Sequence, residues 1–124
     1  MCVLVVDGAN VVGSVPDGWW RDRATAAARL HHHLTSAELP YERVVLVLEG
    51  QARRRVPEGT TAVGELSAVE TVHAPREGDD EIVARCVSAV EGGQEVTVAT
   101  ADRGLLARLD GLGVEVVGPR SVRH

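Results

Sequence analysis

The sequence predicts an α/β fold of three layers, in which a mostly parallel sheet of five strands carries helices on both faces. Short, continuous apolar runs bounded by glycine, proline or charge are typical of strands that are covered on both faces. Segments with the apolar period of a helix separate these runs. Because crossovers between parallel strands are right-handed, the expected strand order is 3-2-1-4-5, that of a Rossmann-like sheet.

Five apolar segments are the expected strands, of which the third is the weakest. In chain order they are Cys2–Val6, Arg43–Leu48, Ala68–His73, Glu95–Ala99 and Val114–Val117. Residues 51–67 lack a clear period and are rich in glycine, which predicts a loop with at most one helical turn. The strand order makes the first and fourth strands neighbours, and ligands of such sheets bind in the crevice at their carboxyl ends.

Three segments are the expected helices. The first begins at residues 17–21, with Asp17 as its N-cap, runs to Ala37 and places Trp20 on its buried stripe. The others span 79–90 and 103–112, and each is followed by glycine.

Length and composition exclude several classes of protein. A chain of 124 residues fits a single domain over 1–124, and 44% hydrophobic with 25% charged residues excludes a disordered or fibrous chain. No apolar run approaches the ~18 residues of a membrane span, and the first run lacks the basic flank of a secretory signal, so a cytoplasmic location is expected. With 13 basic and 18 acidic residues, the net charge of -5 excludes a uniformly basic nucleic-acid coat.

Carboxylates follow the two strands that are expected to meet at the crevice. Asp7 comes directly after the first strand, and Asp102 comes shortly after the fourth. Asn10 adds an amide near Asp7, and Thr100 adds a hydroxyl near Asp102. An alternative is that Asp7 and Asp102 are only turn and helix-cap residues, because aspartate is common at both.

A third carboxylate is expected from the second helix. Asp79 precedes Ile82 by three residues and so falls within the apolar stripe, whereas Asp80 falls at its edge. The third ligand therefore stays open between Asp79 and Asp80, with the helical period favouring Asp79. Glu49, at the end of the second strand, is a fourth carboxylate on the same rim.

Crowded carboxylates repel one another, and a divalent cation removes that repulsion. Oxygen-only ligands suit Mg²⁺ or Mn²⁺, which keep several waters while a phosphate completes the shell. The sequence therefore predicts a metal site made by Asp7, Asp79 and Asp102, which are also the candidate catalytic residues.

Three motifs resemble those of the NYN domains of the PIN-like metal-dependent ribonucleases, specifically the bacterial YacP-like branch. They are Val6–Gly13, Gly78–Ile82 and Val98–Arg103, and the resemblance runs from Val3 to about Pro119. It implies a PIN-like fold, RNA as the partner, and metal-site positions at Asp7, Asn10, Asp79 and Asp102. The chain departs from the family at Glu49, where relatives often carry aspartate, and at Ala101, where many carry serine.

Arginines are expected to surround the acidic crevice and to bind RNA phosphates. Those that follow a strand's carboxyl end or open the next helix are Arg21, Arg23, Arg53, Arg54, Arg55, Arg76 and Arg103. Trp19 is expected near the same rim, where it either stacks on a base or packs under the loop. For Arg53, Arg54 and Arg55 the alternative is that they only solvate a loop.

The expected function is a metal-dependent ribonuclease that hydrolyses RNA phosphodiester bonds with Mg²⁺ or Mn²⁺. One alternative is an RNA- or ribosome-binding module whose weakened metal site does not turn over. Another is a small-nucleotide phosphohydrolase, although the sequence contains no glycine-rich phosphate loop. The oligomeric state is left open between monomer and homodimer.

Overall fold

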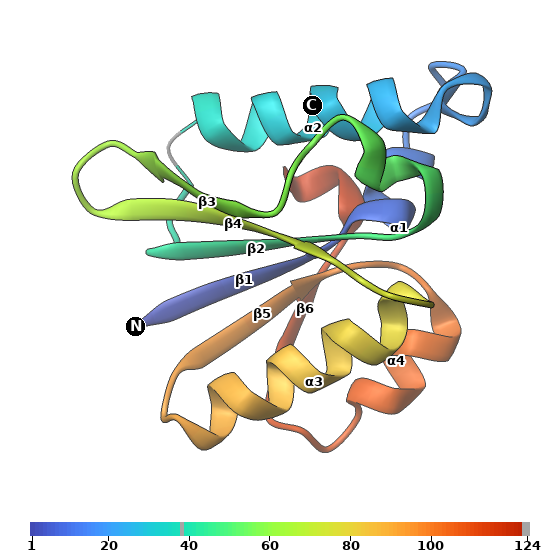
Figure 1. The fold of residues 1–124 in the computed structure, drawn as a ribbon. Helices are drawn as coiled ribbons and strands as arrows, with labels where there is room; N and C mark the ends of the chain where they lie inside the picture. The colour runs from blue at the N-terminus through green and yellow to red at the C-terminus, as the bar shows by residue number, and fades with distance from the viewer. Residues whose placement is uncertain (38, 123–124) are drawn as a thin grey trace.

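The computed structural model describes residues 1–37 and 39–122, which form one mixed sheet with helices on both faces (Figure 1). Its strand order is β3-β4-β2-β1-β5-β6. The strands are β1 (Cys2–Asp7), β2 (Arg43–Leu48), β3 (Gly59–Val63), β4 (Ser67–His73), β5 (Glu95–Ala99) and β6 (Glu115–Val117). Every neighbouring pair is parallel except β3 with β4. The predicted fold class and the predicted order of the five apolar segments are confirmed.

One strand that the sequence did not predict, β3, corrects the expectation of a five-stranded sheet and of a loop over 51–67. That segment contains most of a 3-10 turn, η2 (Gly50–Arg54), and all of β3, which pairs antiparallel with β4. Four of the five β3 residues are exposed, so no buried run marks the strand in the sequence. β3 forms because the backbone of β4 offers it hydrogen-bond partners. The pattern of hydrophobic residues in the sequence does not indicate such pairing.

The helices are α1 (Gly8–Gly13), α2 (Arg23–Ser36), α3 (Gly78–Glu91) and α4 (Arg103–Leu109), with 3-10 turns η1 (Trp19–Arg21) and η3 (Pro119–Val122). In Figure 1, α2 covers one face of the sheet, and α3 and α4 cover the other. None of the helices within the described ranges is long and apolar enough to cross a membrane.

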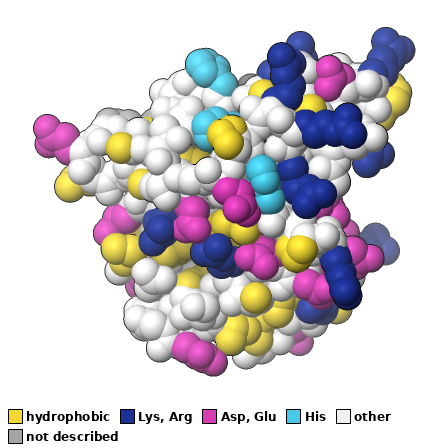
Figure 2. Space-filling model, in the orientation of Figure 1, with side chains coloured by type: hydrophobic (Ala, Val, Ile, Leu, Met, Phe, Trp, Pro, Cys, Tyr) yellow, Lys and Arg dark blue, Asp and Glu magenta, His cyan; other side chains and the backbone are white. Residues whose placement is uncertain are grey.

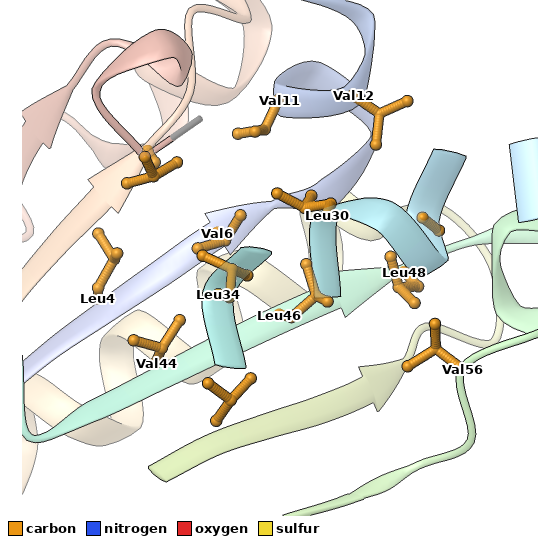
Figure 3. Close-up of a cluster of buried hydrophobic side chains, with 14 of the residues drawn as sticks. Leu4, Val6, Val11, Val12, Leu30, Leu34, Val44, Leu46, Leu48 and Val56 are labelled. Atoms are coloured by element: carbon orange, nitrogen blue, oxygen red, sulfur yellow. The ribbon is translucent and has the colours of Figure 1, made fainter. Parts of the chain in front are cut away.

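Two hydrophobic clusters hold these layers together, one on each face of the sheet. Leu4 and Val6 of β1 pack toward α2, where they meet Leu30 and Leu34 (Figure 3). The alternate β1 residues belong to the second cluster, which includes Ile82 and Cys86 of α3. This alternation buries β1 on both faces, which explains its continuous apolar sequence.

The start of the first long helix differs from the expectation. Asp22, not Asp17, caps α2, and its side chain accepts the backbone N–H of Thr25 at 3.0 Å. Trp20 was expected in the core, but it is 56% exposed. The physical reason is that η1 is a separate turn before Asp22, so the helical period of α2 does not extend back to Trp20.

Gly8 allows α1 to begin directly against β2. A Cβ atom at this position would lie 2.5 Å from the carbonyl oxygen of Val47 and 2.8 Å from Cδ2 of Leu48. Asp7 immediately precedes Gly8, so this close approach sets the position at which Asp7 leaves the sheet.

We expect Gly8→Ala to destabilise the protein by about 1 to 3 kcal/mol, because the added methyl group forces the backbone of α1 and β2 apart. Chemical denaturation measures the effect. Gly13→Ala at the other end of α1 is the matched control, since its Cβ would meet Trp19 at an ordinary 3.6 Å. Equal stability of the two variants would show that the contact with Val47 is not constraining.

Candidate functional site

Asp7 lies where β1 and β5 run side by side. The register pairs Val6 with Ala99, so Asp7 and Thr100 leave the sheet together. Asp7 is only 4% exposed, and its Oδ2 accepts a hydrogen bond from the Thr100 hydroxyl at 2.8 Å. Its Oδ1 accepts the backbone N–H of Asn10 at 3.4 Å and thereby caps α1. Both oxygens of this buried carboxylate are therefore oriented by the protein.

Two further hydrogen bonds hold the segment after β5, one within that segment and one to α1. The Thr100 hydroxyl accepts the backbone N–H of Asp102 at 3.1 Å, and Oδ1 of Asn10 accepts the backbone N–H of Ala101 at 2.8 Å. Asn10 was expected to supply an amide group to a metal, but its oxygen already holds the neighbouring loop. Its role at a metal stays a prediction, and the contact that the structure shows joins α1 to the segment after β5.

Asp102 is exposed and caps α4, with Oδ1 accepting the backbone N–H of Leu105 at 3.0 Å. The alternative role of Asp7 and Asp102 as cap residues is thus their local role in the structure. A carboxylate has about four acceptor positions, and capping a helix uses few of them. Asp7 and Asp102 can therefore cap a helix and still offer lone pairs to a metal ion.

Glu49 directly follows β2, and Asp79 lies in the first turn of α3. Oε2 of Glu49 accepts the backbone N–H of Gly78 at 3.2 Å. Within the described chain Glu77, the N-cap residue of α3, makes no side-chain cap bond, so Glu49 caps this helix from another element. The sequence placed Glu49 on the rim but did not indicate this capping contact.

Asp79 and Asp80 point to different surroundings. Asp79 is half-buried, whereas the side chain of Asp80 is 68% exposed and forms an ion pair with Arg108 at 2.8 Å. The side chain of Asp80 is therefore held by α4, and the structure offers no support for it as a metal ligand.

The carboxylates at the ends of β1, β2 and β5 and at the start of α3 act on one another. Burial raises the pKa of Asp7, and the charges of Asp79 and Asp102 raise it further, while hydrogen bonds from Thr100 and Asn10 oppose the shift. Burial also raises the pKa of Asp79, with added contributions from Asp102 and Glu49. Side chains from β1, α3 and the loop after β5 thus share one electrostatic environment.

The donor atoms fit a hard divalent cation in kind, since all are carboxylate oxygens. Among residues 1–37 and 39–122, however, no three His, Cys, Asp or Glu side chains are gathered closely enough to hold a metal. The expected convergence of three carboxylates on one ion is therefore not a preformed feature. Mg²⁺ keeps several of its waters, so such carboxylates can hold it at longer separations than a fully dehydrated ion would need.

Arginine side chains gather at the carboxyl ends of the strands, at the right of the view in Figure 2. Arg53 is anchored, with Nε donating to the Gly50 carbonyl at 3.1 Å and Nη1 to the Ala74 carbonyl at 3.3 Å. Arg53 and Arg54 line an open groove of about 450 Å³ together with His73, a residue that the sequence did not single out. His73 ends β4 at the edge where the other candidates lie, and that position is the signal that could have indicated it.

The remaining candidate arginines differ in their surroundings. Arg55 donates to the Thr25 hydroxyl at 2.7 Å and so lies against α2. Arg21 lies over the ring of Trp20, 5.8 Å from its centroid. Arg76 and Arg103 are exposed, in the loop before α3 and at the start of α4.

We expect Asp7→Asn to remove part of the pH dependence of the free energy of unfolding, measured in the presence of the chelator EDTA. The pKa of Asp7 is raised from 3.8, so the folded state holds the proton more tightly than the unfolded chain. The stability that Asp7 gains from this proton is fully present at pH values below its pKa in the unfolded chain. It is lost as the pH rises through the pKa of Asp7 in the folded protein. At pH 7, where the wild-type carboxylate is buried and charged, the variant should be more stable than the wild type.

Denaturation curves between pH 3 and pH 8 check this expectation. Asp110→Asn, at the exposed end of α4, removes the same charge and is the control. A pH dependence of stability unchanged by Asp7→Asn would contradict it.

Comparison with known proteins relates the fold of the chain to a solved structure. No protein-family model matches the chain, and no curated protein matches it. Among solved structures, the fold is similar to that of Rae1 (YacP) from Bacillus subtilis, crystallised as a W164L mutant, with a TM-score of 0.60. The sequences are 17% identical, and the match covers 98% of this chain and 72% of that one. The chain therefore shares its fold with YacP, the protein after which the branch that its three motifs resemble is named.

Proposed function

We propose that the protein is a metal-dependent ribonuclease that hydrolyses RNA phosphodiester bonds at the crevice between β1 and β5. The observation that carries the proposal is the placement of three carboxylates at one end of the sheet. Buried Asp7 is hydrogen-bonded to Thr100, the same hydroxyl binds the backbone of Asp102, and Asp79 lies in the first turn of α3. Similarity of fold to YacP and of motifs to the NYN ribonucleases supports it.

In this mechanism Asp7, Asp79 and Asp102 would hold Mg²⁺ or Mn²⁺. When bound, the ion supplies an activated water and stabilises charge on the phosphate oxygens. Thr100 orients Asp7 through its hydroxyl, and Glu49 holds the first turn of α3, from which Asp79 projects. The arginines at the carboxyl ends of the strands bind the flanking phosphates of the RNA.

A second candidate is an RNA- or ribosome-binding module without turnover, which the open spacing of the carboxylates among the described residues favours. A small-nucleotide phosphohydrolase has no comparable support. Chelation separates the first two functions, because a binding module keeps its RNA affinity in EDTA and yields no product when Mn²⁺ is added.

We expect Asp79→Asn to lower the rate of RNA cleavage by roughly 100-fold or more, because it removes one charge from the metal site. Asp80→Asn is a matched control, since it makes the same chemical change one residue away, at a carboxylate paired with Arg108. It should cleave within a few-fold of the wild type. Initial rates on single-stranded RNA with Mn²⁺ measure both.

The two variants also show which aspartate acts. Loss of cleavage in Asp80→Asn alone would transfer the role to Asp80. Wild-type rates in both variants would exclude this crevice as the site of cleavage. Thermal unfolding of each variant separates loss of activity from loss of fold.

We expect replacement of Arg53 and Arg54 by glutamine to weaken RNA binding and to flatten its salt dependence. For single strands the slope of log affinity against log salt falls by about 0.7 for each phosphate that the protein no longer neutralises. Fluorescence anisotropy in EDTA at several salt concentrations measures this. Arg43→Gln is the control, because Arg43 pairs with Glu70 at the opposite edge of the sheet.

Arg53 also hydrogen-bonds to the backbone, so its replacement can disturb the local structure. The single variant Arg54→Gln is therefore measured as well. An unchanged slope in the double variant would exclude the groove beside His73 from the RNA path.

A further inference from the structure

Trp20 is an exposed aromatic residue that has no part in the proposed reaction. It lies in η1, between α1 and α2, and it is 56% exposed. A single exposed apolar residue is common on protein surfaces, so exposure alone indicates no function. The place of Trp20 in the fold and the charges around it are the observations that do.

The turn η1 lies at the same edge of the sheet as the candidate site. Asp7 caps α1 directly after β1, and α1 ends at Gly13, where a Cβ atom would be 3.6 Å from the ring of Trp19. In Figure 1 the segment between α1 and α2 lies at the right of the view, as do the carboxyl ends of β1 and β2. An RNA strand with a phosphate near Asp7 can therefore continue over η1.

Trp19 fixes the turn that presents Trp20. Trp19 is half-buried and packs against the hydrophobic cluster that includes Leu30, and the Arg23 guanidinium lies 5.5 Å from the centroid of its ring. The sequence left stacking on a base or packing open for Trp19, and the structure shows packing. The two indole rings meet at 90° with centroids 6.1 Å apart, so a packed ring supports the exposed one.

Arg21 is the cation that contacts the exposed ring. Its guanidinium lies 5.8 Å from the centroid of the Trp20 ring. Arg21 is itself exposed and takes part in none of the ion pairs between described residues. Stacking on a base is worth more to an aromatic ring than contact with an exposed arginine. A base can therefore replace Arg21 on the ring, and the freed guanidinium can pair with a phosphate of the same strand.

Further arginines surround the start of α2. Arg55 donates to the Thr25 hydroxyl at 2.7 Å, which joins the segment after η2 to α2. Hydrogen bonds from Thr25 lower the pKa of Asp22, and the charges of Arg55 and Arg29 lower it further, so both guanidinium groups act at the N-cap of α2. Arginine side chains gather at the upper right of Figure 2, over this part of the molecule.

These charges are available to a polyanion. Within the part of the chain that the structure describes, no ion pair includes Arg21, Arg23, Arg29 or Arg55. Guanidinium groups without a carboxylate partner bind phosphates, and their charge makes the binding depend on salt.

The combination of an open indole with free arginines favours a single strand. In a duplex each base is covered on both faces by its neighbours, so only the phosphates could reach this surface. Unpaired bases stack on aromatic side chains with little regard to sequence, because every base has an aromatic face.

We propose that η1 is a platform for single-stranded RNA, on which an unpaired base stacks on Trp20 while the flanking phosphates pair with Arg21 and the arginines at the start of α2. The inference rests on the proposed ribonuclease function, since the same strand would continue to the carboxylates. It names the substrate class of that site, an unpaired strand in place of a duplex.

The test measures binding in EDTA, so that it does not depend on cleavage. The probes are a short labelled RNA of mixed sequence and the duplex that it forms with its complement. We expect Trp20→Ala to weaken binding of the single strand by about tenfold, or 1.4 kcal/mol, and binding of the duplex by less than about twofold. Trp20→Phe keeps an aromatic ring and should retain most of the affinity. Fluorescence anisotropy measures all of these.

A matched control and a second readout make the test specific. Leu66→Ala removes another exposed apolar side chain, 86% exposed in the turn between β3 and β4, and should bind both probes like the wild type. The protein has two tryptophans, so its NMR spectrum has two indole N–H signals, which Trp20→Phe assigns. The single strand should shift the signal of Trp20 more than that of Trp19.

The outcomes distinguish this inference from the proposed function. Loss of single-strand affinity in Trp20→Ala, in a protein that does not cleave RNA with Mn²⁺, would support the platform and overturn the ribonuclease. Cleavage by the wild type together with an unchanged affinity of Trp20→Ala, or with an equal loss in Leu66→Ala, would overturn the platform and leave the ribonuclease intact. A wild type that binds neither probe would also overturn the platform.

Discussion

The hydrogen bond between the Thr100 hydroxyl and the buried Asp7 carboxylate, 2.8 Å long, is the contact on which the rest of the site depends. It forms because β1 and β5 are parallel neighbours, so the ends of both strands reach the same point. Through Thr100 the contact continues to the backbone of Asp102, and Asn10 adds a parallel link to Ala101. Two segments more than 90 residues apart are thereby joined into one rim.

This rim concentrates negative charge at a cost in stability. Asp7 is buried, and the pKa values of Asp7 and Asp79 are raised by burial and by neighbouring carboxylates. A folded state that keeps such charges together without a cation is less stable than one that pairs them. Perturbed carboxylates of this kind are common at functional sites, and the surrounding arginines give the same edge a surface that attracts a polyanion.

Glu49 connects the parts of this edge. It caps α3, and its charge contributes to the raised pKa of Asp79. A single carboxylate therefore holds the first turn of the helix that carries a candidate ligand. Asp80, one residue beyond Asp79, is instead paired with Arg108 on α4.

The sequence by itself determined the five apolar strands, their order and the edge at which Asp7, Asp79 and Asp102 lie, because burial on both faces and right-handed crossovers leave few alternatives. It did not determine β3, whose exposed residues pair only through the backbone of β4. Only the tertiary structure decided which tryptophan is exposed and which oxygen Asn10 and Glu49 use to hold a neighbouring segment. Periodicity reports burial within one element, whereas these contacts depend on how separate elements meet.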